Sequence, residues 1–219
     1  MMTALTLRTL GGGRDELAAE AIWLGRVLAE LLPDGPEVHG LLAMMLLHDS
    51  RREARFRDGE LVLLGDQDRS LWNTEQLAAG RAELDRALAL RGRGPYVLQA
   101  AIASLHAETP CDWAQIAALY GRLARLTGSP IVELNRAIAI AIAVAETDGP
   151  EAGLRVVDQL GLDDFRYLHS TRAELLRRLG RTDEARDAYR RARQLTGDGA
   201  ERRFLERRLT ELVGRTGSD

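Results

Sequence analysis

The stretch that decides the class of fold covers residues 169–197 and reads HSTRAELLRRLGRTDEARDAYRRARQLTG. The small side chains of Ala173 and Ala185 allow two paired helices to approach each other closely, and Gly180 supplies the turn between them. The residues that set the spacing are Ala173, Gly180, Ala185, Tyr189 and Ala192. The stretch therefore predicts two antiparallel helices joined by a short turn.

This spacing is that of a tetratricopeptide (TPR) repeat. The segment PEAGL at 150–154 matches DEAR at 183–186, thirty-three residues later, and REAR at 52–55 is a fainter echo. One such unit cannot bury its apolar face alone, so upstream helices must cover it. We predict an all-α fold of antiparallel helix pairs stacked as a TPR-like right-handed solenoid. A polar helix over 199–213 closes it, and one short extended insertion lies near 58–72.

Apolar residues recur at helical spacing over nearly the whole chain. Four prolines stand where the first residue of a helix is expected, since their missing amide proton is unpaired there anyway: Pro36, Pro95, Pro130 and Pro150. We expect residues 1–14 to form a linker, 15–213 the helical domain and 214–219 a disordered tail. The predicted helices cover 15–32, 36–56, 74–90, 95–108, 113–126, 130–146, 150–160, 164–179, 183–195 and 199–213.

The composition excludes several classes of chemistry. All 30 basic residues among the 219 are arginine, which excludes a Gly-Lys-Ser/Thr phosphate loop and Schiff-base catalysis. The single cysteine, Cys111, excludes an internal disulfide and multi-cysteine metal clusters. The longest apolar run, 137–145, is too short for the roughly 18 residues that cross a bilayer. With no signal peptide recognised, we expect a cytoplasmic protein without cofactors.

The charge is distributed unevenly along the chain. Residues 1–165 hold 16 arginines against 24 acids, whereas residues 166–219 hold 14 arginines against 9 acids. A basic end could attract a polyanion or an acidic protein surface. The interleaved acids favour the simpler interpretation, a solvated helix face. The arginines of this candidate surface are Arg177, Arg178, Arg181, Arg190, Arg203 and Arg207.

Two groups of residues suggest a metal or ligand site. His48 and Asp49 are adjacent, as in metal-dependent phosphohydrolases, but no His-x-x-x-His pair accompanies them. A histidine at a helix end explains His48 more simply. Cys111 and Asp112 follow His106, although Asp112 has the spacing of a helix cap. An alternative hypothesis is therefore an enzyme-like pocket centred on His48, His106 and Trp113.

The densest polar cluster is DQDRSLW at 66–72. Asp66 and Asp68 lack the third acid and the loop glycine of a calcium site. Two interpretations stay open. In the structural one, Asp66 or Asp68 pairs with Arg69 while Trp72 anchors the loop. In the functional one, the loop contacts a partner protein.

Five motifs together resemble a known family. The chain over roughly 17–213 is similar to the TPR-like C-terminal extension of a subgroup of extracytoplasmic-function (ECF) RNA polymerase sigma factors. The motifs occur in the family's order and read HGLLAMMLLHDSR at 39–51, DQDRSLW at 66–72, GPYVLQAAIA at 94–103, SPIVELNRA at 129–137 and RAELLRRLGR at 172–181. The resemblance implies a non-enzymatic interaction domain that acts in control of transcription initiation.

The chain departs from the family at its start. Only LTLRTLGG at 5–12 resembles the end of a sigma domain, and the recognition helix that would enter the major groove is missing. Direct DNA binding is therefore not expected, and weak nucleic-acid binding by the C-terminal arginines stays an alternative. The partners that the resemblance implies are sigma domains, the RNA polymerase core or a small YCII-related protein.

We predict that the 66–72 loop is the contact, with the arginines as a secondary surface. The expected contact residues are Asp66, Gln67, Asp68, Arg69 and Trp72. Replacing Asp68 and Arg69 together by alanine is expected to abolish partner binding and to leave helicity and melting temperature intact.

Overall fold

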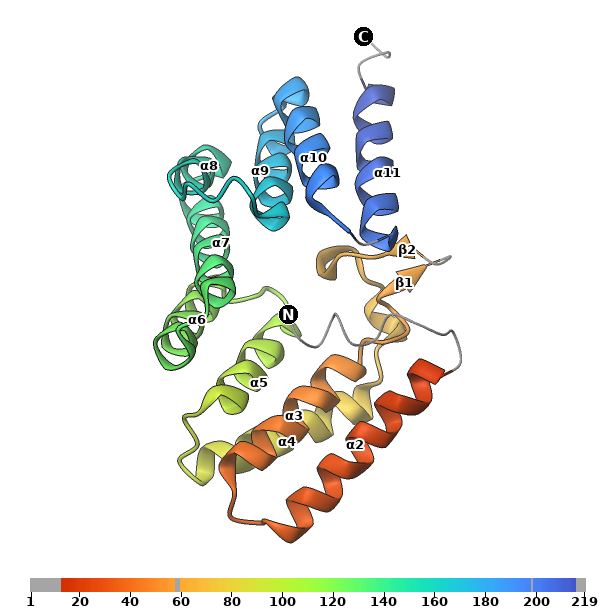
Figure 1. Cartoon of the computed structure of the whole chain (residues 1–219), viewed down its shortest axis with the longest axis vertical. Coiled ribbons are helices and arrows are strands. Elements are labelled where there is room, and N and C mark those ends of the chain that lie inside the picture. The colour runs from red at the N-terminus through yellow and green to blue at the C-terminus, as the bar shows by residue number, and fades with distance from the viewer. Residues whose placement is uncertain (1–12, 58–59, 198, 216–219) are drawn as a thin grey trace. The chain divides into compact units, whose positions relative to one another are not determined.

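The structure, a computed structural model, describes residues 13–57, 60–197 and 199–215 (Figure 1). Within them the chain is almost entirely helical, which confirms the predicted all-α class. The helices are α2 (Gly13–Leu31), α3 (Pro36–Asp49), α4 (Thr74–Ala89), α5 (Pro95–His106), α6 (Trp113–Thr127), α7 (Pro130–Thr147), α8 (Pro150–Asp158), α9 (Arg166–Arg178), α10 (Thr182–Leu195) and α11 (Gly199–Arg215). Between α3 and α4 lie strands β1 (Phe56–Arg57) and β2 (Glu60–Leu61) and the 3₁₀ turns η1 (Leu64–Asp66) and η2 (Arg69–Leu71).

The starts of the helices follow the sequence signals. Each of the four prolines is the first residue of its helix, as predicted. The side chain of Asn73 accepts a hydrogen bond from the amide of Gln76 at 2.9 Å and so caps α4. Asp112 caps α6 in the same way, through the amide of Gln115 at 2.8 Å. Gly180, in the turn before α10, has φ +72°, a conformation that glycine adopts without strain.

The predicted helix over 36–56 is wrong at its end, because α3 stops at Asp49. The Ser50 hydroxyl donates to the Leu47 carbonyl, and the Ser50 carbonyl accepts from the amide of Asn73 at 2.8 Å. The Ser50 carbonyl is therefore bonded to Asn73 instead of to an amide of a continuing helix. The chain then forms turns and the short antiparallel pair β1–β2, in which Phe56 lies opposite Leu61.

One compact unit holds the described residues of 1–54, 68–111 and 119–132. Its central helix is α3, which packs against α2, α4 and α5. Leu47 and Val97 lie in its core, where both are almost completely buried. Gly40 allows a close approach of α3 to α5, since a Cβ atom there would lie 2.7 Å from the Val97 nitrogen.

The second unit holds the described residues of 55–67, 112–118 and 133–219. Here α8 packs on α9, α9 on α10 and α10 on α11, and α11 also contacts β2 (Figure 1). Ala173, Ala185 and Ala192 are fully buried, and Tyr189 lies among them. The small residues that predicted a close helix pair therefore lie in the core of this unit.

The ends of the predicted domain differ slightly from the structure. Helix α2 begins at Gly13 instead of 15, and α11 continues to Arg215 instead of 213. The predicted linker falls largely in 1–12 and the predicted tail in 216–219, and both stretches lie outside the described residues. Among the residues that are described, no helix is long and apolar enough to cross a membrane.

Candidate protein-contact site

The residues of the 66–72 loop are divided between the two units. Asp66 and Gln67 belong to the second unit, whereas the segment from Asp68 through Trp72 belongs to the first. Each half is therefore held by a different set of neighbours, and the two halves are described in turn.

The first-unit half is a single 3₁₀ turn that exposes its outer edge. The Asp68 carboxylate accepts from the Ser70 amide at 2.9 Å and from the Ser70 hydroxyl at 2.7 Å, which fixes the start of the turn. Asp68, Ser70 and Leu71 are exposed, and the Leu71 side chain is 50% accessible. The exposed edge of the turn therefore presents one leucine beside two polar side chains.

Arg69 and Trp72 hold this turn from behind. The Arg69 guanidinium donates to the carbonyl of Ala107 at 2.8 Å and to that of Glu108 at 3.1 Å. Both carbonyls follow the C-terminus of α5, where the helix dipole favours a cation. Arg69 also lies over the Trp72 ring, 4.6 Å from its centroid, and Trp72 is only 6% exposed. Trp72 therefore anchors the turn, and Arg69 is bonded to backbone carbonyls.

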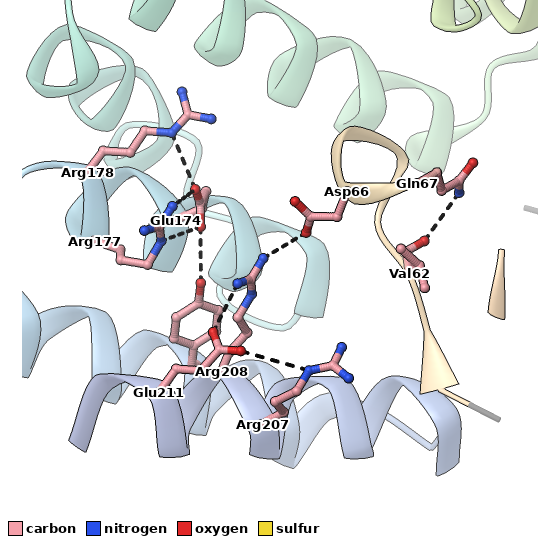
Figure 2. A network of polar contacts seen from close by, with 10 residues as sticks. Val62, Asp66, Gln67, Glu174, Arg177, Arg178, Arg207, Arg208 and Glu211 are labelled. Carbon is pink, nitrogen blue, oxygen red and sulfur yellow. Dashed lines mark hydrogen bonds and ion pairs between the residues drawn. The ribbon is translucent and has the colours of Figure 1, made fainter. Parts of the chain in front are cut away.

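The second-unit half is attached to α11 (Figure 2). Asp66 accepts from Arg208 at 2.9 Å, and its side chain is 57% exposed. The Gln67 side-chain amide donates to the Val62 carbonyl at 3.2 Å. Arg208 also donates to Glu211 at 3.0 Å. Asp66 is thus joined through Arg208 to Glu211 of α11.

Glu174 is the centre of a second group of polar contacts, on α9 and α10 (Figure 2). It accepts two hydrogen bonds from Arg177, at 2.9 and 2.6 Å, and others from Arg178 at 3.4 Å and the Tyr189 hydroxyl at 3.3 Å. Burial alone would raise the pKa of Glu174, but the hydrogen bonds and charges of Arg177 and Arg178 outweigh it and the pKa is lowered. Burial, then the Glu174 carboxylate, raises the pKa of Tyr189, which keeps the phenol protonated as a donor.

Most arginines of the predicted basic surface are matched by acids. Besides the two on Glu174, Arg181 pairs with Glu184 at 2.7 Å and Arg190 with Asp187 at 3.0 Å. Arg207 lies 4.0 Å from Glu211, and Arg203 is exposed on the same helix. Spacings of three and four residues place such acids on the same helix face as the arginines. The positive charge counted from the sequence is therefore largely neutralised locally.

Two of the histidine candidates, His48 and His106, belong to the first unit, and both lie near Arg51. Burial first, and then the nearby Arg51 charge, lower the pKa of His106 to about 4. Arg51 also lies 3.4 Å from His48, so a cation already occupies this region. Trp113 belongs to the other unit. Throughout the described part of the chain, no group of three His, Cys, Asp or Glu side chains is arranged to hold a metal ion.

The neighbours of these histidines have structural contacts. The Cys111 thiol points to the carbonyls of His106 and Glu108, and Asp112 is the cap of α6 described above. His39 is buried between Glu83, at 2.7 Å, and the Pro33 carbonyl, at 2.9 Å. Each of these polar groups satisfies a bonding requirement of the fold.

The sequence analysis missed the outer face of α2. Six large apolar side chains of α2 and of the turn that follows it are exposed. They are Leu17, Trp23, Leu24, Leu28, Leu31 and Leu32. The spacing of the leucines is visible in the sequence. It does not reveal which of the two apolar faces of α2 is buried.

The chain is similar to one family model and to one curated protein. Residues 10–88, which include α2, α3 and the 66–72 loop, match a model described as "Family of unknown function (DUF6596)". Over 209 residues the chain is 45% identical to "Uncharacterized protein R00370" of Rhizobium meliloti (strain 1021), a match that covers 92% of this chain. No solved structure matches.

The match covers only 48% of the R. meliloti protein, so the chain spans about half the length of this curated relative. Neither printed name refers to a sigma factor. The chain is therefore similar to part of a longer protein, and the similarity assigns an activity to neither of them.

Proposed function

We propose that this chain is a non-enzymatic protein-interaction domain of a sigma-factor-like protein that acts in the control of transcription initiation. The observation that carries the proposal is the turn at Asp68–Leu71. Its outer edge is exposed, whereas Arg69 and Trp72 fix it from behind. A pre-ordered loop loses little conformational entropy on binding, which favours recognition of a protein surface.

The helix pairs are proposed to stack as a TPR-like right-handed solenoid. Supporting this, α8, α9, α10 and α11 pack in sequential order, and the small residues expected at a TPR seam are buried. Helix stacks of this kind generally serve as binding scaffolds for other polypeptides. A scaffold role agrees with polar side chains that are engaged in caps and ion pairs.

The link to transcription depends on the five sequence motifs that resemble an ECF sigma-factor extension. The relative from R. meliloti leaves about half of its own length outside the match, as expected if such a domain is attached to other domains. We therefore propose sigma domains or the RNA polymerase core as partners, and a YCII-related small protein as a further one.

The experiment is a binding titration of the whole chain against purified RNA polymerase core and, separately, against purified ECF sigma domains. The test variant replaces Ser70 and Leu71 by alanine, because both are exposed on the turn. The control replaces Leu88 on α4, a leucine of similar exposure at 51%. We expect a loss of affinity of about tenfold or more in the loop variant, since a leucine side chain buried at a contact contributes about 1.5–3 kcal/mol.

The outcome that contradicts the proposal is saturable binding that the loop variant leaves unchanged, or no binding to either protein. The Asp68–Arg69 double alanine variant is less suitable than the sequence suggested. Arg69 supports the turn through two carbonyls and the Trp72 ring, so its removal alters stability as well as binding.

A further inference from the structure

The buried face of α2 carries one large apolar side chain, Ile22, whereas most large apolar side chains of the helix are exposed. The face toward α3 carries Ile22, Gly25 and Ala29, and a Cβ atom at Gly25 would lie 3.3 Å from Leu42 Cδ1. This face is therefore in close contact with the unit through little apolar surface. The larger apolar side chains of the helix lie elsewhere on its circumference.

The outward row has the spacing of a helix-packing seam. Leu17, Ala21, Leu24, Leu28 and Leu31 follow one another at intervals of four, three, four and three residues. With about 3.6 residues per turn, these positions share one face, and they correspond to the a and d positions that meet a neighbouring helix. The exposed fractions are 56% for Leu17, 58% for Leu24, 37% for Leu28 and 71% for Leu31.

Helix α11 provides an internal comparison. Its large apolar side chains Phe204, Leu205 and Leu212 are at most 6% exposed, and polar residues such as Glu206 and Arg207 face outward. That is the pattern of a capping helix in a helix stack, whose outer face must be polar. Helix α2 lacks this pattern. Its outer face is built like that of an internal helix, which requires a neighbour on both sides.

The residues beside the row are acidic. Glu16 and Glu20 lie on the flank of the row by helical geometry and are exposed, and no ion pair joins them to other residues of the described chain. The one arginine of α2 whose side chain is described, Arg26, points away from the row by helical geometry, since it lies about half a turn from Leu24 and Leu28. One edge of the apolar row is thus bordered by the negative charges of Glu16 and Glu20.

We propose that this face of α2 is a docking surface for an amphipathic helix of a partner polypeptide. That helix would carry a leucine-type row flanked by arginine or lysine. A second copy of the chain is a poorer occupant, because its own Glu16 and Glu20 border the same row and would bring like charges together. The proposal goes beyond the loop contact, since it concerns a separate surface and does not depend on the identity of the transcription partner.

The test uses two synthetic helical peptides of roughly three heptads with leucine at a and d, one with lysine and one with glutamate at the flanking positions. Binding of each labelled peptide to the whole chain is measured by fluorescence anisotropy at low salt. We expect the lysine peptide to bind about tenfold or more tightly than the glutamate peptide, since complementary charge selects the partner.

Matched variants identify the surface. Leu24→Glu with Leu28→Glu should abolish binding of the lysine peptide, whereas Leu88→Glu, at a leucine of similar exposure on α4, should not change it. Glu16→Lys with Glu20→Lys should reverse the preference toward the glutamate peptide. These carboxylates are exposed, so this variant stays decisive if the double leucine variant fails to fold.

Three results would overturn the proposal. These are equal binding of both peptides, binding that the Leu24 and Leu28 variants leave unchanged, and a dimer in analytical ultracentrifugation that Leu24→Glu dissolves. The last would assign the face to a second copy. The Ser70–Leu71 loop variant should bind the lysine peptide normally, so failure of this inference and failure of the proposed function are distinguished.

Discussion

At the scale of single residues, Arg69 explains how a polar loop keeps a defined shape. Its guanidinium joins two carbonyls beyond α5 to the ring of Trp72. We predict that Arg69→Ala lowers the free energy of unfolding by about 2–3 kcal/mol, because hydrogen bonds to a charged group are lost and two carbonyls lose their donor. Urea unfolding measures the change.

Two controls accompany this prediction. Arg93→Ala removes an exposed arginine from the same unit and should change stability by less than about 0.5 kcal/mol. Arg69→Lys keeps the charge but not the planar fork, so its loss should be intermediate. Equal stability of Arg69→Ala and the parent chain would show that the loop does not need this anchor.

His106 gives a prediction about pH. Burial and Arg51 lower the pKa of His106 from 6.5 to about 4. Between these two pH values the imidazole is therefore neutral in the folded chain and protonated in the unfolded chain. Stability from this residue is complete above pH 6.5 and is lost as the pH falls toward 4, by up to about 3 kcal/mol. Urea unfolding at pH 7 and pH 4.5 measures the loss.

His106→Gln is the comparison variant for this pH effect. It should flatten the dependence between pH 6.5 and about 4, since the titrating group is gone. Glu174, whose pKa is lowered, acts in a separate window: its stabilisation is lost only as the pH falls below the ordinary carboxylate range. An unchanged pH dependence in His106→Gln would contradict the account.

At the scale of elements, Gly40 sets the distance between α3 and α5. Alanine is the better helix former by about 1 kcal/mol, which alone would make Gly40→Ala stabilising. A Cβ atom there would, however, lie 2.7 Å from the Val97 nitrogen and 2.9 Å from its Cα, so backbone must move. Since overpacking costs about 1–3 kcal/mol or more, we predict a net loss of stability in thermal unfolding.

Gly65→Ala is the matched control for this prediction, because nothing lies within 4 Å of a Cβ atom built there. It should leave the melting temperature almost unchanged. A Gly40→Ala variant that is more stable than the parent would mean that α3 and α5 are not packed as described.

The elements were largely predictable where local chemistry decides them. Prolines at first helical positions and the caps at Asn73 and Asp112 act within one turn, so sequence alone locates them. The end of α3 was not predictable, since the Ser50 carbonyl is taken by Asn73, whose position depends on the folded loop. Likewise, the carbonyl partners of Arg69 lie 38 and 39 residues away.

The candidate site was predictable only as a cluster of residue types. The sequence marked the 66–72 loop as polar and offered two interpretations of it. Burial of Trp72 and the bonds of Arg69 and Asp66 come from tertiary neighbours that no local pattern names. Hydrophobic periodicity likewise located α2 but could not show which of its two apolar faces is covered.

At the scale of the whole molecule, two units with separate hydrophobic cores share one chain, and one of the places where it passes between them lies within the 66–72 loop. Most arginines of the C-terminal helices form ion pairs with neighbouring acids. These pairs weaken the alternative hypothesis that this surface binds nucleic acid. The exposed turn is the feature on which the proposed protein contact depends.

The most direct measurement of this claim is a titration of the whole chain against purified RNA polymerase core and ECF sigma domains. The account predicts saturable binding with a Kd of about 10 µM or tighter, within the ordinary range for specific protein pairs. It also predicts that alanine at Ser70 and Leu71 weakens this binding while the Leu88 control does not. Absence of saturable binding to either protein at about 100 µM would contradict it.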